Sequence, residues 1–198
     1  MSNTTLASLI DKFNTWLDEA KNCPQIIEPT AMCLATVSAD TQPLARMVLL
    51  KQVNEQGFYF FTNQNSQKGQ DLQQNNKVAL CFYWGFLKKQ VRIVGFVKQA
   101  SKQESDDYFA SRPHQSQIGA WASTQSQPMQ NWQEFENKIQ YFSEKFSQQP
   151  VPRPDFWCGF ILVPTQIEFW QEQDFRLHHR FLYTKQPDDS WQEQQLYP

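Results

Sequence analysis

The sequence predicts a mainly β protein, an antiparallel barrel with helices at its periphery. Strand-like segments outnumber helical ones along the chain, which favours a barrel over a doubly wound sheet. Hydrophobic residues make up 40% of the 198 residues, and the chain contains 16 Phe and 7 Trp. Such a composition can bury a substantial core, so we expect a globular fold.

The first half of the chain combines an amphipathic helix with five predicted strands. Apolar residues at helical spacing predict a helix over residues 4–20, namely Leu6, Leu9, Ile10, Phe13, Trp16 and Leu17. Residues 40–43, Asp-Thr-Gln-Pro, are typical of a turn, and residues 66–74 of a short helix. β-Branched and aromatic residues predict strands over 31–38, 44–53, 57–63, 77–84 and 90–97.

The second half adds two helices and further strands. Ser101 and Glu104 form the pattern of a capping box, and Pro113 should end this helix near Arg112. An apolar stripe predicts a longer helix over 130–146. Strands are predicted over 159–163, 166–171, 180–183 and 191–196. We expect residues 1–198 to form one domain, with helical insertions near 101–147.

Composition argues against several classes of partner. The net charge is −2, without a basic stripe for nucleic acid or a polybasic segment for an anionic membrane. The chain begins without a charged segment followed by an apolar run, and its apolar runs are too short to span a bilayer. Cys23, Cys33, Cys81 and Cys158 form no C-x-x-C pair, so we expect free thiols and a cytoplasmic location.

Glycine and histidine patterns limit how a ligand could be held. The six glycines form neither G-x-G-x-x-G nor a P-loop, so a phosphate would need cationic side chains and helix termini. The only histidines are His114, His178 and His179. Neighbouring side chains on a strand point to opposite faces, so His178 and His179 would not chelate together and we expect no metal site.

Two segments in the first half could supply such cations. Arg46 and Lys51 lie at the ends of an apolar strand, and an Arg fork suits two phosphate oxygens. They face opposite sides of a regular strand, so a shared site needs a twist, a bulge or two ligands. Residues 65–68, Asn-Ser-Gln-Lys, open a helix whose N-terminus suits an anion. Taken alone, each pattern favours solvated charges on an ordinary strand or helix.

Two further clusters lie in the second half. Tyr108 and Arg112 share a helix face, and Ser116 follows, so a phenol, a guanidinium and a hydroxyl could bind a second phosphate. The alternative is a helix C-terminus with an Arg near its dipole. If residues 176–180 are extended, Arg176, His178 and Arg180 project to one side, which inside a barrel would require an anionic ligand. The alternative is an exposed basic edge strand.

Taken together, these segments resemble the pyridoxamine 5'-phosphate oxidase family. The resemblance runs from about residue 28 to the C-terminus in the family's order. Each motif alone is short and weak. The motifs together, in the family's order, are highly specific. The matching segments are 28–32, 46–51, 61–63, 89–91, 108–113, 116–121, 125–126, 168–171, 176–178 and the closing Trp191, Leu196 and Pro198.

The resemblance implies a fold and a reaction. The fold is an antiparallel, Greek-key-like split β-barrel that dimerises with FMN at the interface between chains. The reaction converts pyridoxamine or pyridoxine 5'-phosphate to pyridoxal 5'-phosphate. A hydride leaves the C4' carbon for flavin N5, and O2 then reoxidises the flavin and gives H2O2.

The resemblance also implies site residues. FMN contacts are implied at Arg46, Met47, Val48, Leu49, Leu50, Lys51, Phe61, Thr62, Gln67, Lys68, Gln90, Gln125, Ser126, Trp170 and Arg180. Substrate contacts are implied at Lys51, Tyr108, Arg112, Ser116, Arg176 and His178. Of these, Arg176 and His178 are the implied catalytic residues, which cover the pyridine ring and position C4'.

The chain departs from the family's pattern at four places. Gln67 stands where the family usually has Arg, which predicts looser FMN binding, and His179 stands in place of Asp. Residues 171–173, Gln-Glu-Gln, replace a glycine-rich segment, and the basic N-terminal arm is absent or short. Two other functions remain open beside the oxidase: a split-barrel FMN reductase for another substrate, and a non-catalytic pyridoxal-phosphate-binding protein. A purely structural barrel leaves the cluster at 176–180 unexplained.

Overall fold

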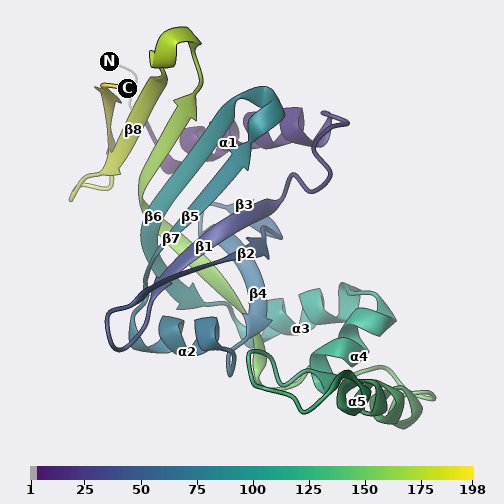
Figure 1. The fold of residues 1–198 in the computed structure, drawn as a ribbon. Coiled ribbons are helices and arrows are strands. Elements are labelled where there is room, and N and C mark those ends of the chain that lie inside the picture. Colours follow the sequence, from purple (N-terminus) through teal and green to yellow (C-terminus); the bar gives the residue numbers. More distant parts are fainter. Residues whose placement is uncertain (1–3) are drawn as a thin grey trace.

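The computed structural model describes residues 4–198, which form one nine-stranded antiparallel sheet and five α-helices (Figure 1). This confirms the predicted mainly β, antiparallel class. The segment before the first helix, predicted to be short, lies partly outside the described residues. Seven strands follow one another across the sheet: β2 (Pro43–Leu49), β1 (Ala31–Val37), β5 (Lys77–Trp84), β6 (Lys89–Gln99), β7 (Trp157–Gln171), β4 (Gly57–Asn63) and β3 (Gln52–Asn54).

The long strand β7 connects the two ends of the sheet. Its first half pairs with β4, its second half pairs with β8 (His179–Lys185), and β6 pairs along most of its length. β9 (Trp191–Leu196) then pairs with β8. The two strands predicted over 159–163 and 166–171 are therefore one strand. A register shift between Val94 and Gly95 occurs near its middle, where a Cβ on Gly95 would lie 2.1 Å from the Val163 carbonyl oxygen.

The single strand predicted over 44–53 is instead two strands, β2 and β3. The break lies at Leu50 and Lys51 because the backbone changes partners there. The Leu50 N–H donates to the Thr30 carbonyl, whereas the Lys51 N–H donates to the Tyr59 carbonyl on β4. The break separates Lys51 from the strand that carries Arg46: Arg46 contacts Thr36 and Asp71, whereas Lys51 lines a cavity with Tyr108.

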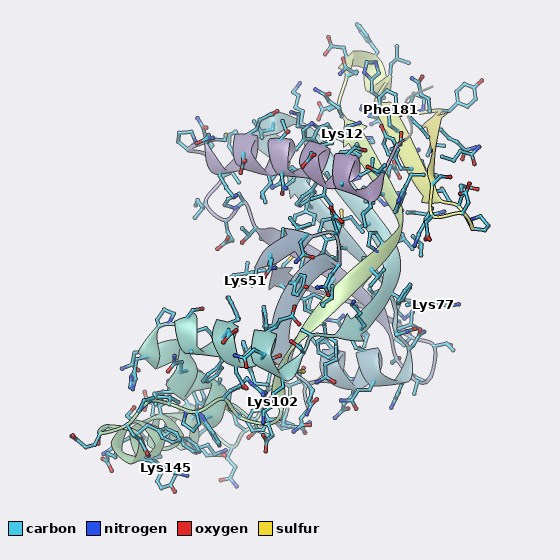
Figure 2. All side chains as sticks on the ribbon, turned by 180° about the vertical axis from the view of Figure 1, so that it is seen from behind. Lys12, Lys51, Lys77, Lys102, Lys145 and Phe181 are labelled. Carbon is cyan, nitrogen blue, oxygen red and sulfur yellow. The ribbon has the colours of Figure 1, made fainter. Side chains whose placement is uncertain are left out.

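Helix α1 (Leu6–Lys21) confirms the helix predicted over 4–20. It packs against the sheet and covers the main core. Thr5 and Ser8 cap it reciprocally. Phe13 is fully buried, and its ring lies edge-on to Phe58 and Phe82 at 5.1 and 5.0 Å between centroids. Figure 2 shows Lys12 on α1 close to Phe181 of β8, and its Nζ lies 5.3 Å from that ring.

The remaining helices gather at the end of the sheet where β4 finishes (Figure 1). They are α2 (Gln67–Gln74), α3 (Lys102–Ser111), α4 (His114–Ala122) and α5 (Trp132–Lys145). α3 has the predicted capping box and ends before Pro113. α4 was not predicted; it starts directly after Pro113, whose fixed φ suits the start of a helix. No helix within residues 4–198 has the length and apolarity needed to cross a membrane.

Candidate active site

A polar cluster surrounds Lys68 at the N-terminus of α2. Ser66 caps this helix, and its hydroxyl accepts from the Gly69 N–H at 3.3 Å. The Lys68 Nζ lies 3.4 Å from the Thr62 hydroxyl, 3.5 Å from the Ser66 hydroxyl and 3.3 Å from Oε1 of Gln125. Together with the free N–H groups of the first helical turn, this cluster can hold an anion.

The charge of Lys68 has no acidic partner. Within residues 4–198 no carboxylate lies within ion-pair distance of its ammonium. Burial lowers the pKa of Lys68, the nearby charge of Arg46 lowers it further, and Asp71 partly opposes both effects. A half-buried ammonium in this state is stabilised by an added anion.

Arg46 has a different environment because its charge is balanced inside the protein. Its guanidinium donates to the Thr36 hydroxyl at 2.6 Å and lies 3.4 Å from the buried carboxylate of Asp71. Gln67 donates to the same carboxylate at 2.9 Å, so its side chain is held by Asp71. The other residues of this strand differ in exposure: Met47 is exposed, whereas Val48 and Leu50 pack in the core.

A cavity of about 290 Å³ lies beside the Lys68 cluster and contains Arg112. Its lining includes Thr62, Asn63, Arg112, Ser116, Gln125 and Trp157. The Arg112 guanidinium lies over the Trp157 ring at 4.8 Å, and its buried Nη1 has no hydrogen-bond partner among the described residues. Burial lowers the pKa of Arg112, although this group stays protonated. A buried donor without a partner is costly, so the cavity suits a ligand with anionic oxygens.

Lys51 and Tyr108 line an adjacent cavity of about 310 Å³. The Phe61 ring stacks on Tyr108 at 4.1 Å and on Trp157 at 5.4 Å. This stack connects the two cavities, because Tyr108 lines one and Trp157 lines the other. The structure therefore brings together the predicted residues Thr62, Lys68, Arg112, Ser116 and Gln125, with Lys51, Phe61 and Tyr108 next to them.

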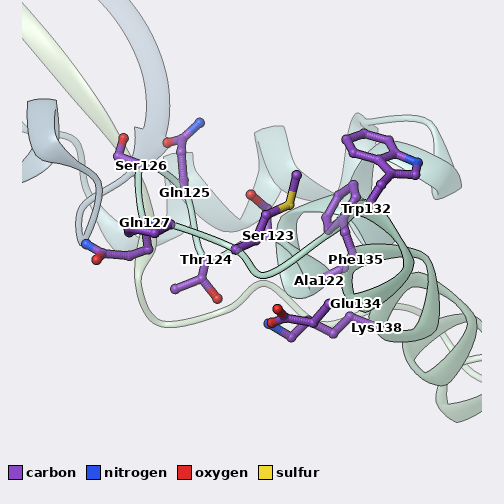
Figure 3. Close-up of a pocket in the computed structure, with 12 residues that line it drawn as sticks. Ala122, Ser123, Thr124, Gln125, Ser126, Gln127, Trp132, Glu134, Phe135 and Lys138 are labelled. Atoms are coloured by element: carbon purple, nitrogen blue, oxygen red, sulfur yellow. The ribbon is translucent and has the colours of Figure 1, made fainter.

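A further cavity of about 490 Å³ lies on the other side of the Gln125 segment (Figure 3). Ser126 lines it and has a positive φ of 69°, which is uncommon for a residue other than glycine. Trp132 and Phe135 of α5 form its apolar wall. Of the implied cofactor residues, only Gln125 and Ser126 reach this cavity.

A second group of predicted residues lies at the far end of β7. Strand register places Gln90 opposite Trp170, and Trp170 opposite Arg180. The His178 ring lies 4.7 Å from the Trp170 ring, and its Nδ1 accepts from the Gln173 N–H at 3.3 Å. Three implied FMN residues therefore form one row across three strands, with His178 beside them.

The extended conformation considered for residues 176–180 is wrong. Asp174–Arg176 form a short 3-10 turn, and Phe175 and Arg176 have positive φ values of 56° and 64°. The strand begins only at His179, so Arg176, His178 and Arg180 do not share a strand face. The glycine-rich segment of the family is absent here, and the tight turn between β7 and β8 uses left-handed non-glycine residues instead.

The two groups lie at opposite ends of the protein (Figure 1). Thr62 is paired with Cys158 at one end of β7, and Arg180 with Trp170 at the other. At about 3.3 Å per residue these positions are roughly 40 Å apart along the strand, which is far more than one mononucleotide spans. Within one chain, no single ligand can contact both groups.

Several residues of these clusters were missed from the sequence. Ser66 is not among them, because it belongs to the segment 65–68 that the sequence predicts as an anion-binding helix start, and its hydroxyl caps α2. Asp71, Trp157 and Glu168 gave no such signal, because their roles depend on contacts with residues far away in the sequence. Among the described residues, no three His, Cys, Asp or Glu side chains form a cluster that could hold a metal ion.

Comparisons with known proteins identify relatives of this chain. Residues 18–146 match the family model "Pyridoxamine 5'-phosphate oxidase", and residues 157–198 match "Pyridoxine 5'-phosphate oxidase C-terminal dimerisation region". A pyridoxine/pyridoxamine 5'-phosphate oxidase of Trichormus variabilis is 49% identical over 94% of this chain and 87% of its own length. The enzyme of the same name from Ehrlichia chaffeensis is 46% identical over 96% and 97% of the two chains.

Solved structures show the same fold. The crystal structure of PhzG from Burkholderia lata, in complex with tetrahydrophenazine-1-carboxylic acid, has a TM-score of 0.89 at 26% identity and covers 96% of this chain and 92% of its own. An FMN-binding protein from Nostoc punctiforme has a TM-score of 0.78 at 17% identity, with 95% and 96% coverage, which bears on the fold alone. The predicted split barrel, oxidoreductase class and FMN cofactor are confirmed at the level of the family, and a dimerisation region supports a homodimer. The chain belongs to the pyridoxamine 5'-phosphate oxidase family.

Proposed function

We propose that this protein oxidises pyridoxamine or pyridoxine 5'-phosphate to pyridoxal 5'-phosphate, with FMN as cofactor, O2 as electron acceptor and H2O2 as second product. One observation carries the proposal: two unbalanced cations, Lys68 and Arg112, lie near a common cavity that contains Thr62 and Gln125. The reaction needs two phosphate sites, one for the cofactor and one for the substrate. A phosphate monoester carries about −1.5 to −2 charges at neutral pH, and each cation supplies a partner.

The Lys68 cluster fits the phosphate of FMN. Its hydroxyl, amide and ammonium groups surround the N-terminus of a helix, and Lys68 lacks a carboxylate partner among residues 4–198. When bound, FMN supplies the hydride acceptor and the group that O2 reoxidises. The residues proposed to hold it are Arg46, Met47, Val48, Leu49, Leu50, Lys51, Phe61, Thr62, Gln67, Lys68, Gln90, Gln125, Ser126, Trp170 and Arg180.

The Arg112 cavity fits the phosphate of the substrate. Arg112 offers an unpaired donor and Ser116 a hydroxyl, while Tyr108 and Lys51 line the neighbouring cavity and add a phenol and an ammonium. We propose that these four residues anchor the phosphate and fix the distance to the reacting carbon. Arg176 and His178 then cover the pyridine ring and orient C4', which is a positioning contribution to the rate.

We propose that the complete site forms between two copies of the chain. Arg176, His178 and Arg180 lie at the end of β7 opposite to Arg112 and Lys68, so a partner must supply one set. A two-fold dimer would pair the two ends and create two equal sites. The match of residues 157–198 to a dimerisation region supports this arrangement, because that region carries the second set. We also propose that residues 1–198 form one domain, since β7 pairs with strands from both family segments.

A second candidate function is oxidation of a different ring system by the same fold. The likeness to PhzG, whose structure contains tetrahydrophenazine-1-carboxylic acid, supports a ligand with a different ring system. Such an enzyme would retain FMN binding and would not need the phosphate contacts of Arg112 and Ser116. The buried Nη1 of Arg112, which lacks a hydrogen-bond partner among the described residues, therefore favours the phosphorylated substrate.

An aerobic assay with added FMN tests the proposal. Pyridoxamine 5'-phosphate should yield aldehyde and H2O2 in equal amounts, and dephosphorylated pyridoxamine serves as the matched control. We expect the control to lose at least roughly thirtyfold in kcat/KM, because about 2 kcal/mol or more of charge-assisted contact is lost. Bound flavin without turnover of either phosphate ester would refute the proposed reaction. Equal rates for both amines would refute the phosphate site.

A further inference from the structure

Glu168 on β7 is a buried carboxylate with two guanidinium partners. Its side chain is 8% exposed. Oε1 accepts from Nε of Arg180 on β8 at 2.7 Å, and Oε2 accepts from Nη1 of Arg92 on β6 at 3.2 Å. Three adjacent strands thus contribute to one ion cluster. A buried carboxylate persists only when it is paired in this way.

Arg180 is fixed at two points. Besides the Nε contact with Glu168, its Nη1 donates to the Tyr197 carbonyl at 3.2 Å. The hydrogen bond that Arg180 donates to Glu168 also raises the pKa of Arg180. Two of the five guanidinium N–H groups are thereby used, and the donors that remain lie on the two terminal nitrogens. The guanidinium is held as a rigid, oriented fork before any ligand binds.

The position of Arg180 links this cluster to the cofactor. Arg180 shares its cross-strand row with Trp170 and Gln90. Glu168 lies two residues before Trp170 and projects to the same face of the sheet. Arg92 also contacts Glu168, but its side chain is 51% exposed and it lies outside the row. The same carboxylate therefore has one partner in the proposed flavin row and one outside it.

We propose that Glu168 is a positioning residue that presents the Arg180 guanidinium to the flavin. This inference rests on the proposed role of Arg180 in FMN binding. An Arg side chain loses considerable rotamer freedom when it binds, and a carboxylate that fixes it beforehand removes that cost from cofactor binding. Glu168 thus acts on the flavin without touching it, through the Nε contact. If Glu168 had only a structural role, it would link β6, β7 and β8 through Arg92 and Arg180 equally.

The test compares FMN affinity in four purified variants, measured by quenching of flavin fluorescence. Glu168→Gln keeps the size of the side chain and removes its charge, and we expect FMN binding to weaken by about tenfold. Arg92→Gln is the matched control, and we expect a change below about twofold. Arg180→Ala should weaken binding at least as much as Glu168→Gln. The double variant of Glu168 and Arg180 should be no weaker than Arg180→Ala, because Glu168 acts through Arg180.

A rate measurement separates positioning from folding. At saturating FMN and without oxygen, the flavin reduction rate should fall in Glu168→Gln and remain near wild type in Arg92→Gln, while thermal midpoints report stability for each variant. Equal effects of Glu168→Gln and Arg92→Gln on FMN affinity would overturn the inference, as would an undiminished effect of Glu168→Gln in the Arg180→Ala background. A wild-type protein that binds FMN without forming aldehyde refutes the proposed reaction alone. One that binds no FMN refutes both.

Discussion

Arg112 and Arg176 are proposed to contact one substrate molecule, yet they lie near opposite ends of β7, whose positions 158 and 170 are roughly 40 Å apart along the strand. If two chains share each site, a defect in one chain can be complemented by a partner that carries the other defect. We therefore predict that Arg112→Ala and Arg176→Ala are each nearly inactive, yet restore activity when they form a dimer together. Each substitution removes a charged contact of about 2–5 kcal/mol, at least roughly a thirtyfold loss of kcat/KM.

The magnitude follows from counting sites. A dimer with one chain of each variant has one site without either substitution and one site with both. It should show about half of the wild-type activity. Random pairing at equal amounts makes about half of the dimers mixed, so the unfractionated mixture should reach about one quarter.

The assay co-expresses the two variants with different affinity tags and isolates mixed dimers by two successive purifications. Aldehyde formation is then measured at saturating FMN. Arg112→Ala combined with Tyr108→Ala is the matched control, because both residues are proposed to anchor the substrate phosphate from the same chain, so every site of a mixed dimer lacks one of them. Mixed dimers of Arg112→Ala and Arg176→Ala that remain as inactive as their parents would refute the shared site.

Three other predictions follow from individual contacts. The lowered pKa of Lys68 predicts that its ammonium loses its proton, and FMN binding weakens, in a pH range that begins below the ordinary lysine value of 10.5. Lys68→Arg stays charged and is the control in the same FMN titrations. An equal decline in this variant would contradict the prediction. Gln67→Arg should tighten FMN binding by about tenfold and Gln67→Glu should weaken it, and equal dissociation constants would show that the missing family charge is irrelevant. Phe13→Ala should lower the free energy of unfolding by about 3–5 kcal/mol in a denaturant titration, whereas Ile27→Ala, at a residue that is 96% exposed, should change it by less than about 0.5 kcal/mol; similar losses would contradict the assigned core.

Local patterns predicted most of the elements because the responsible interactions are local. The stripe on α1 and the Ser101 capping box depend on residues three or four positions apart, and both are present. The break at Leu50 and Lys51 was missed because it arises when the backbone exchanges one partner strand for another. The partner residues, Thr30 and Tyr59, lie outside the local sequence, so no local pattern could reveal the break. α4 was missed because Pro113 was taken only as a helix end, although proline also suits a helix start.

The site was predicted from motifs, whereas its division into two groups was not visible from spacing. Gln90, Trp170 and Arg180 are far apart in sequence and adjacent in the sheet, and only the register of β6, β7 and β8 reveals this. The segment at Arg176 failed for a different reason. Alternating residues suggest a strand, but the chain must reverse between β7 and β8, and the reversal forces Phe175 and Arg176 into left-handed conformations.

Some cations of the site have a carboxylate partner in the same chain and others do not. This difference predicts what each cation does. Asp71 balances Arg46, and Glu168 balances Arg180, so these arginines are already ordered and gain little Coulomb energy from a further anion. Lys68 and Arg112 have no carboxylate partner within residues 4–198, so an incoming phosphate repays their desolvation. Substitution of Lys68 or Arg112 should therefore act mainly on affinity for a phosphate. Substitution of Arg46 or Arg180 should also disturb the protein around it, because each removes one charged partner from a buried carboxylate.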